Sequence, residues 1–284
     1  MAIASERVKL VFRKTERDLI RLVKGHDPEA VHSFRTSTRR LQILIEELAS
    51  SGDRNDKKLL KMLNRIRRRA GKVRDLDAQL TAFRGFKIPL EPRRRTQLTQ
   101  RMIELRAKHE SKMAKLLKKS EIRDILKRLR RSARAVDLGG AHDPLQVARQ
   151  MLKSVDHPTG RIREDALHRY RIAVKRARYV AEFAPKSVES VELTAQLKKL
   201  QDALGTWHDW LLLTHTAIEQ LGEINQSPLV AAMQNVTRSK FRHAISTLAI
   251  SPAAGAAQKN SPTLTAVRRL AISALPSGVT ESAA

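Results

Sequence analysis

The nine residues His32–Arg40, HSFRTSTRR, return 136 residues later as HRYRIAVKR at His168–Arg176. Both copies read His-x-aromatic-Arg-x-x-x-basic-Arg, and each follows an apolar residue, Val31 or Leu167. A repeat at this separation indicates two similar structural units in one chain. Because the repeated element is a run of cations with a histidine in it, we expect a polyanion to be held between two related surfaces.

The pattern separates a cationic side from an apolar side. On a helix that turns about 100° per residue, His32, Arg35 and Arg39 fall within an arc of roughly 60°, whereas Phe34 and Leu41 lie elsewhere. The second copy divides in the same way, so each helix can pack its apolar face into a bundle while its cationic stripe faces a groove or solvent. The residues of the two stripes and their margins are His32, Arg35, Arg39, Arg40, His168, Arg171, Lys175, Arg176 and Arg178.

The repeat extends beyond the stripes. A Gly-x-x-basic-Asp segment spans Gly71 to Asp75 and returns at an offset of 134 as Gly205 to Asp209. Two matched segments in the same order favour duplication of a helical bundle. We expect the glycines to allow close helix packing or a local kink, and the aspartates to order neighbouring cations or backbone.

Glutamates also occupy matching positions beside the stripes. Glu46 and Glu182 each follow a possible partner by one helical turn, Gln42 and Arg178 respectively. Such a carboxylate either orients an arginine by a paired hydrogen bond or forms an ordinary surface ion pair.

Further cations follow the first stripe. In the helix predicted over 55–83 they step by three or four residues and form one ridge, and the helix predicted over 93–118 adds cations that do not alternate with acids. We add six of them to the stripe residues as candidate contacts of the polyanion. They are Lys61, Arg65, Arg68, Lys72, Lys108 and Lys112.

The overall charge supports an anionic partner. The 284 residues carry a formal net charge of +27, and most of it lies in residues 1–140, which hold 38 lysines and arginines against 17 acids. A folded chain with this much self-repulsion usually has an anionic partner that offsets it.

Composition indicates an all-α fold. Aromatic residues make up only 4% of the chain, and long stretches lack glycine and proline, which is typical of helical proteins rather than β-sheet ones. We predict one helical unit over 1–140, a second over 141–250, and a mostly disordered tail over 251–284 with a short helix near 263–274. The predicted helices span 5–24, 28–49, 55–83, 93–118, 121–134, 145–154, 162–184, 188–222 and 227–249.

Several classes of protein are excluded or disfavoured. The absence of cysteine excludes disulfides and cysteine-ligated metals, and neither stripe histidine has a chelating partner, so we expect no metal and no cofactor. No apolar run approaches the roughly 18–20 residues of a membrane span, and Met1–Lys14 lacks a signal-type segment. We therefore expect a soluble protein of the cytoplasm, with Trp207 and Trp210 in its core.

At these residues the chain resembles the conserved histidine α-helical domain (CHAD) family. The resemblance covers about residues 5–250 and rests on the two stripes and the two Gly-x-x-basic-Asp segments. It implies two tandem antiparallel four-helix bundles related by pseudo-twofold symmetry, with a basic groove or channel between them that the stripe residues line. It also implies binding of inorganic polyphosphate and, in bacteria, association with polyphosphate granules.

The sequence also departs from a fully symmetric pattern. His208 stands where the first half has Arg74, and the second Gly-containing helix is much less basic than the first. The chain has no Glu-x-Glu-x-Lys segment of the metalloenzyme domain that is sometimes fused to this family, so we expect a stand-alone module.

Three functions remain open from the residues. The first is a non-enzymatic polyphosphate-binding protein, which fits because arginine and lysine suit closely spaced phosphates that carry no bases. The second is a nucleic-acid-binding protein that uses the same charge, although no known nucleic-acid-binding motif is present. The third is a phosphohydrolase or phosphotransferase that uses His32 or His168, although no acidic metal cluster or Walker loop supports it.

Overall fold

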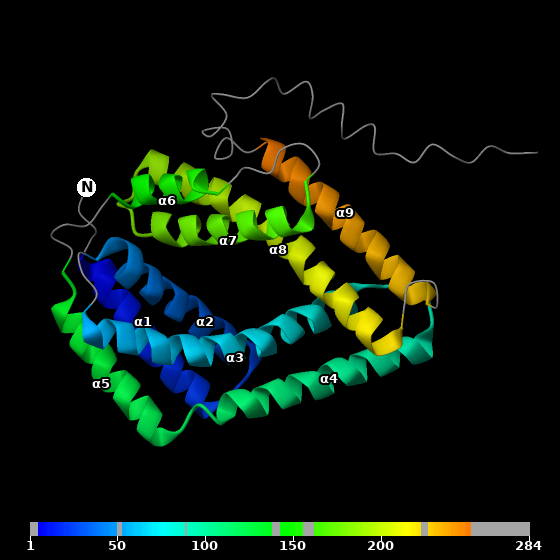
Figure 1. Ribbon diagram of the computed structural model, residues 1–284, viewed down its shortest axis with the longest axis horizontal. Coiled ribbons are helices and arrows are strands. Elements are labelled where there is room, and N and C mark those ends of the chain that lie inside the picture. Colours follow the sequence, from blue (N-terminus) through cyan, green and yellow to red (C-terminus); the bar gives the residue numbers. More distant parts are fainter. Residues whose placement is uncertain are drawn as a thin grey trace, which may run out of the picture.

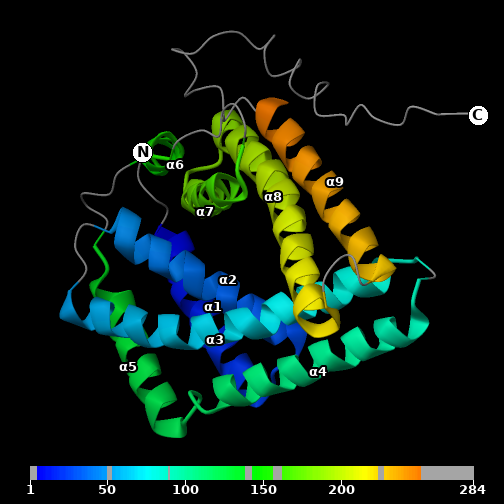
Figure 2. The same ribbon diagram turned by 45° about the vertical axis from the view of Figure 1, so that its right-hand side comes forward.

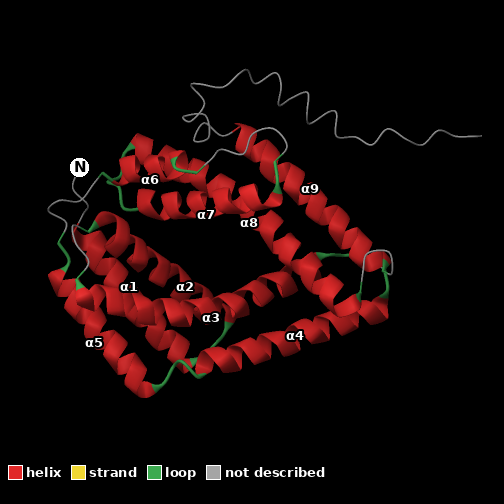
Figure 3. Ribbon diagram, viewed as in Figure 1, coloured by secondary structure: helices red, strands yellow, loops and turns green. Residues whose placement is uncertain are grey.

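The computed structural model describes residues 5–49, 53–88, 90–137, 143–155, 162–222 and 227–250. Every regular element within these ranges is a helix (Figure 3), which confirms the predicted all-α class. The predicted tail, the short helix near 263–274 and the predicted junction of the two units at residues 140 and 141 lie outside the described residues.

The helices follow the predicted order. Those of the first half are α1 (Ser5–Lys24), α2 (Pro28–Ile43), its π-helical continuation η1 (Leu44–Leu48), α3 (Arg54–Gly85), α4 (Pro92–Ala114) and α5 (Lys119–Ala135). Those of the second half are α6 (Pro144–Lys153), α7 (Glu164–Ala181), α8 (Val188–Leu221) and α9 (Pro228–Ile250). None of the described helices combines the length and the apolar character that a membrane crossing needs.

Side-chain N-caps mark the starts of α2, α3, α6 and α8. Asp27 is the N-cap of α2, as predicted, because its carboxylate accepts from the backbone N–H groups of Glu29 and Ala30. The prediction of one helix over 93–118 was wrong at its end: α4 stops at Ala114. Leu116 and Leu117 pack against the main core there, and this burial, rather than a glycine or proline, accompanies the break.

Four helices form a closed ring at the centre of the molecule. The stripe helix α2 packs against both α3 and α7, and α8 packs against the same two helices (Figures 1 and 2). Outside the ring, α1 and α5 cover the first side, α6 covers α7, and α4 and α9 run along α3 and α8. The ring therefore consists of the two stripe helices, α2 and α7, and the two Gly-containing helices, α3 and α8.

Two hydrophobic cores hold this arrangement, and each takes residues from both halves. The main core joins α1, α2, α3 and α5 to α6, α7 and the first part of α8, with Phe34 and Tyr170 among its fully buried side chains. The second core joins the C-terminal parts of α3 and α8 to the N-terminal parts of α4 and α9, around Met102 and Met233. The pseudo-twofold relation between two bundles stays a prediction.

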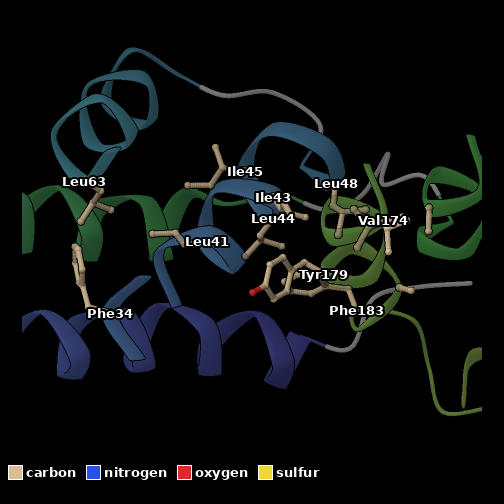
Figure 4. Close-up of a cluster of buried hydrophobic side chains, with 14 of the residues drawn as sticks. Phe34, Leu41, Ile43, Leu44, Ile45, Leu48, Leu63, Val174, Tyr179 and Phe183 are labelled. Atoms are coloured by element: carbon tan, nitrogen blue, oxygen red, sulfur yellow. The ribbon is translucent and has the colours of Figure 1, made fainter. Parts of the chain in front are cut away.

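The seam between α2 and α7 is apolar in the middle and ionic at its edges. Leu44 and Leu48 of η1 lie beside Tyr179 and Phe183 at the end of α7 (Figure 4). Two ion pairs flank this contact in a reciprocal way: Arg40 Nε lies 2.8 Å from Glu182 Oε2, and Arg176 pairs with Glu47.

The π-helical turn explains why Glu47, and not Glu46, which aligns with Glu182 in the repeat, faces α7. In η1 the N–H of Ala49 donates to the carbonyl oxygen of Leu44, five residues back, so the turn holds one extra residue. Glu46 instead accepts from the Gln42 amide at 2.9 and 3.0 Å, and Glu182 accepts from Arg178 at 2.5 Å. Both predicted local partners are thus confirmed.

A buried ionic network fastens α4 to the rest of the first half. Arg106 donates from Nε to Asp77 Oδ1 at 2.7 Å, from Nη1 to Glu110, and from Nη2 to the carbonyl oxygen of His26 at 2.9 Å. The His26 ring lies 3.1 Å from Glu110. Asp77 is only 7% exposed, so its charge depends on Arg106 for compensation.

Candidate anion-binding site

Five half-buried basic side chains converge inside the helical ring. Arg35 and Arg39 come from α2, Arg67 from α3, and Arg171 and Lys175 from α7. The charge of Arg35 lowers the pKa of each of the other four, so all four lie close enough to Arg35 to interact with it electrostatically. We call these five residues the central cluster.

The charges of the central cluster are poorly compensated. Desolvation first, and then the neighbouring arginines, lowers the pKa of Lys175 to about 8 and that of Arg67 to about 10. Desolvation also lowers the pKa of Arg171, and the charges of Asp209 and Asp75 partly offset this decrease. Yet within the described ranges no ion pair of 4.0 Å or less involves any of the five.

Neutral oxygens hold three of the arginines in place. Arg35 donates from Nη1 to the backbone carbonyl oxygen of Arg67 at 3.2 Å, and Arg39 donates to Gln42 Oε1 at 3.4 Å. Arg67 donates from Nη2 to Asn64 Oδ1 at 2.9 Å. A carbonyl oxygen orients a guanidinium without cancelling its charge, so the cluster is arranged in advance and remains attractive to an anion.

Gly71 makes the position of Arg35 possible. A Cβ atom at Gly71 would lie 2.5 Å from Arg35 Nη1, which is too close, whereas a Cβ at Gly205 would meet nothing within 4 Å. The prediction of close packing is therefore wrong for Gly205. At Gly71 a guanidinium, rather than a neighbouring helix, makes the close approach.

We expect Gly71→Ala to weaken anion binding at least about ten-fold, because the added Cβ displaces the Arg35 guanidinium from its carbonyl partner and thereby costs the anion one charged hydrogen bond of about 1.5–3 kcal/mol. Gly205→Ala is the matched control: the same exchange, also in the interior of a long helix, should leave the affinity unchanged. Titration of both variants with the same anion checks this, and equal affinities for the two would contradict the role of Gly71.

The two stripe histidines border the central cluster. His32 is exposed, and partial desolvation followed by the charge of Arg74 lowers its pKa. The ring of His168 stacks on that of His208, with centroids 5.1 Å apart. Desolvation, then His208 and Arg171, lowers the pKa of His168. Each stripe histidine thus lies near the side chain three residues after the glycine of its own half.

Both tryptophans are buried, as predicted. The Trp207 ring lies edge-on to that of His208, with centroids 6.4 Å apart. Its fluorescence therefore offers an intrinsic reporter of events at the His168–His208 pair.

Three of the predicted contact residues form ion pairs at the seam between α2 and α7. Arg40 and Arg178 both pair with Glu182, and Arg176 pairs with Glu47. The guanidinium carbons of Arg40 and Arg178 also lie 5.6 and 4.8 Å from the centroid of the Tyr179 ring. Their charges are already matched. Arg40 and Arg176 join the two halves, whereas Arg178 pairs within the second half and orients the Glu182 carboxylate that Arg40 contacts.

Six other predicted contacts are not members of the central cluster, although the charge of one of them, Arg68, contributes to the lowered pKa of Arg67. The members on α3 sit roughly 100–160° around the helix from Arg67 and so face outward. The six, all exposed, are Lys61, Arg65, Arg68, Lys72, Lys108 and Lys112.

Sequence reasoning missed Arg67 as a member of the site and named Arg74 only within the repeated segment. A signal for both was present, because Arg67, Gly71 and Arg74 are spaced by four and three residues and share one face of α3. The repeated glycine could have identified that face as the inner one.

The fold and the site together define a class: an all-α protein in which two repeated basic helices face a central cationic cluster. A family model described as CHAD domain matches residues 6–217, so the chain belongs to the CHAD family. The resemblance inferred from the stripes is confirmed. No curated protein matches this sequence.

Two solved structures are similar in fold. The crystal structure of the CHAD domain from the plant Ricinus communis is 19% identical, with a TM-score of 0.57, and the match covers 97% of this chain and 93% of that one. PptA from Streptomyces chartreusis is 15% identical, with a TM-score of 0.60, and the match covers 92% of this chain and 100% of that one. At these identities the likeness concerns the fold alone.

Proposed function

We propose that this protein binds inorganic polyphosphate in the central cluster and catalyses no reaction on it. The observation that carries the proposal is the cluster itself: five half-buried cations with no carboxylate within ion-pair distance among the described residues. Desolvated like charges destabilise a fold unless an anion compensates them. A ligand that places several phosphates side by side supplies that compensation.

Polyphosphate fits the cluster better than nucleic acid does. The site consists of guanidinium, ammonium and imidazole groups, while both tryptophans are buried in the cores. Single-stranded nucleic acids gain much of their binding energy from base stacking on aromatic rings. A chain of phosphates without bases needs only dense donors, which the arginines provide.

The test is a competition titration at about 150 mM salt, where exposed charges are already screened. Labelled long-chain polyphosphate competes against duplex DNA, single-stranded RNA and heparin at equal anionic charge. We expect polyphosphate to win by orders of magnitude. If all polyanions compete alike, the protein is only a cationic surface, and nucleic acid becomes the better candidate.

Affinity for polyphosphate should fall as the pH rises above about 8. Lys175 has a pKa of about 8 in the free protein, and bound phosphates favour its charged form, so binding takes up a proton above this pH. If bound phosphates raise the pKa of Lys175 to near 10, the affinity falls about ten-fold per pH unit between the pKa of the free protein and that of the complex. Lys175→Arg, which keeps its charge, should flatten titrations run from pH 7 to 9.5; an unchanged slope would assign the proton elsewhere.

The absence of catalysis and the association with polyphosphate granules are parts of the same proposal. Incubation with polyphosphate should release no orthophosphate and leave no phosphohistidine at His32 or His168. In cells that store the polymer, a labelled protein should gather on the granules, and the substitutions that abolish binding should disperse it.

A further inference from the structure

A second cationic surface lies on the outer sides of α3 and α4. Exposed Arg69 and Lys72 of α3 and exposed Lys108 and Lys112 of α4 surround His109. Burial first, and then these four cations, lowers the pKa of His109, which places them within electrostatic reach of one ring. We call Arg69, Lys72, Lys108 and Lys112 the outer patch.

The outer patch and the central cluster face in opposite directions. Arg69 and Lys72 lie roughly 140–160° around the α3 axis from Arg67. An α-helix with its side chains is about 10–12 Å across, so α3 stands between the two sets of cations. A short oligophosphate cannot touch both at once.

The charges of the outer patch also lack nearby acids. In the described part of the chain, none of its four residues has an ion pair of 4.0 Å or less. The closest acids along α4 are taken: Glu104 pairs with Arg101, and Glu110 pairs with Arg106. The patch therefore presents four free cations to solvent.

The patch lacks the large aromatic side chains on which bases stack most strongly. Helix α4 contains no phenylalanine, tyrosine or tryptophan, and the single aromatic residue of α3, Phe83, is buried. A flexible anion without bases suits such a surface better than a single-stranded nucleic acid does.

We propose that the outer patch is a second, independent polyphosphate-binding site, so that one protein molecule holds two segments of polymer. This inference rests on the proposed function of the central cluster. A divalent protein and a multivalent polymer form a network, in which one chain runs through several protein molecules and each molecule holds two chains. Long polyphosphate should then cross-link the protein, and an oligomer too short to reach a second molecule should not.

The experiment compares wild type with a variant that carries Lys72→Gln, Lys108→Gln and Lys112→Gln. A charge-matched control carries Lys199→Gln, Arg238→Gln and Arg242→Gln, which neutralise three exposed cations of α8 and α9. Light scattering follows assembly as polyphosphate of several hundred units is added, and calorimetry measures binding of tripolyphosphate. Helical content by circular dichroism verifies that all variants are folded.

We expect wild type and the control to scatter strongly at an intermediate ratio of polymer to protein and to clear again in excess polymer. The outer-patch variant should lose most of this scattering, at least ten-fold, while the affinity of the central cluster for tripolyphosphate changes less than two-fold. A variant with Arg171→Ala and Lys175→Ala should lose the tight binding of tripolyphosphate, retain only weak binding of this oligomer at the exposed outer patch, and keep a salt-sensitive binding of the long polymer.

Three results would overturn the inference. The outer-patch variant and the control could scatter alike, or tripolyphosphate alone could produce the assembly. Duplex DNA could also drive assembly better than polyphosphate does, which would make the patch a nucleic-acid surface. Failure of wild type to bind tripolyphosphate or long polymer would instead refute the proposed function, so the two failures are distinguishable.

Discussion

Replacing Arg35, Arg39, Arg171 and Lys175 together by alanine should reduce the affinity for polyphosphate at least about 1,000-fold. Each of these cations can make a charged hydrogen bond to a phosphate, and such bonds contribute about 1.5–3 kcal/mol each. The loss should be larger than the net charge explains, because the four lie in one half-buried cluster. A titration at about 150 mM salt measures it.

The stability of this variant separates a binding role from a structural one. Removing desolvated like charges relieves their repulsion, so Tm without ligand should stay the same or rise. The charge-matched control replaces four exposed cations, Lys57, Lys119, Lys199 and Arg238, by alanine. This control should bind within about three-fold of wild type at that salt concentration, where exposed charges are screened. Equal losses in both variants would show that only net charge matters.

Asp77→Ala should destabilise the fold by about 3 kcal/mol, because it removes one partner of a buried ion pair and leaves the Arg106 charge partly uncompensated. We take the lower end of the usual range since Arg106 keeps Glu110 and the carbonyl oxygen of His26. For a chain of this size the change corresponds to a fall in Tm of about 6–12 °C.

Thermal unfolding followed by circular dichroism measures that fall. Asp202→Ala is the control, because the Lys198–Asp202 pair at 2.7 Å has both side chains more than half exposed, and such pairs contribute little. A Tm for Asp77→Ala equal to that of Asp202→Ala would mean that the buried network does not hold α4 in place.

Much of the fold was predictable because the local sequence of most helices shows their periodicity or their start. The stripe helices have a clear apolar face, and Asp27 followed by Pro28 marks a helix start that the structure reproduces. The end of α4 was not predictable in this way. The segment after Ala114 keeps a helical composition, and only burial of Leu116 and Leu117 in a core formed by distant helices favours the break.

The site was predictable only in part, for a similar reason. The stripes identify Arg35, Arg39, Arg171 and Lys175 by their spacing, and the structure brings these four together. On α3, however, cations occur on nearly every side, so periodicity does not show which face is turned inward. Tertiary packing decides this, and it selects Arg67 while leaving Lys61, Arg65, Arg68 and Lys72 outside.

The partner of Arg176 shows a different limit. The sequence aligns Glu46 with Glu182, but the π-helical turn holds one extra residue and moves Glu47 to the contact with α7. A register change of this kind depends on how the end of α2 packs on Tyr179 and Phe183, which no local pattern reveals.

The two halves share both hydrophobic cores, and this sharing affects how fast the protein is degraded in a cell. If one half opens, the other loses part of its core and the central cluster comes apart, so the proposed ligand, polyphosphate, should bind only the fully folded chain. A ligand present at 100 times its Kd then adds about 2.7 kcal/mol to the free energy of unfolding. Proteases that act on opened chains would therefore remove the protein faster once the polymer is consumed, and its abundance would follow the polymer supply without any transcriptional control.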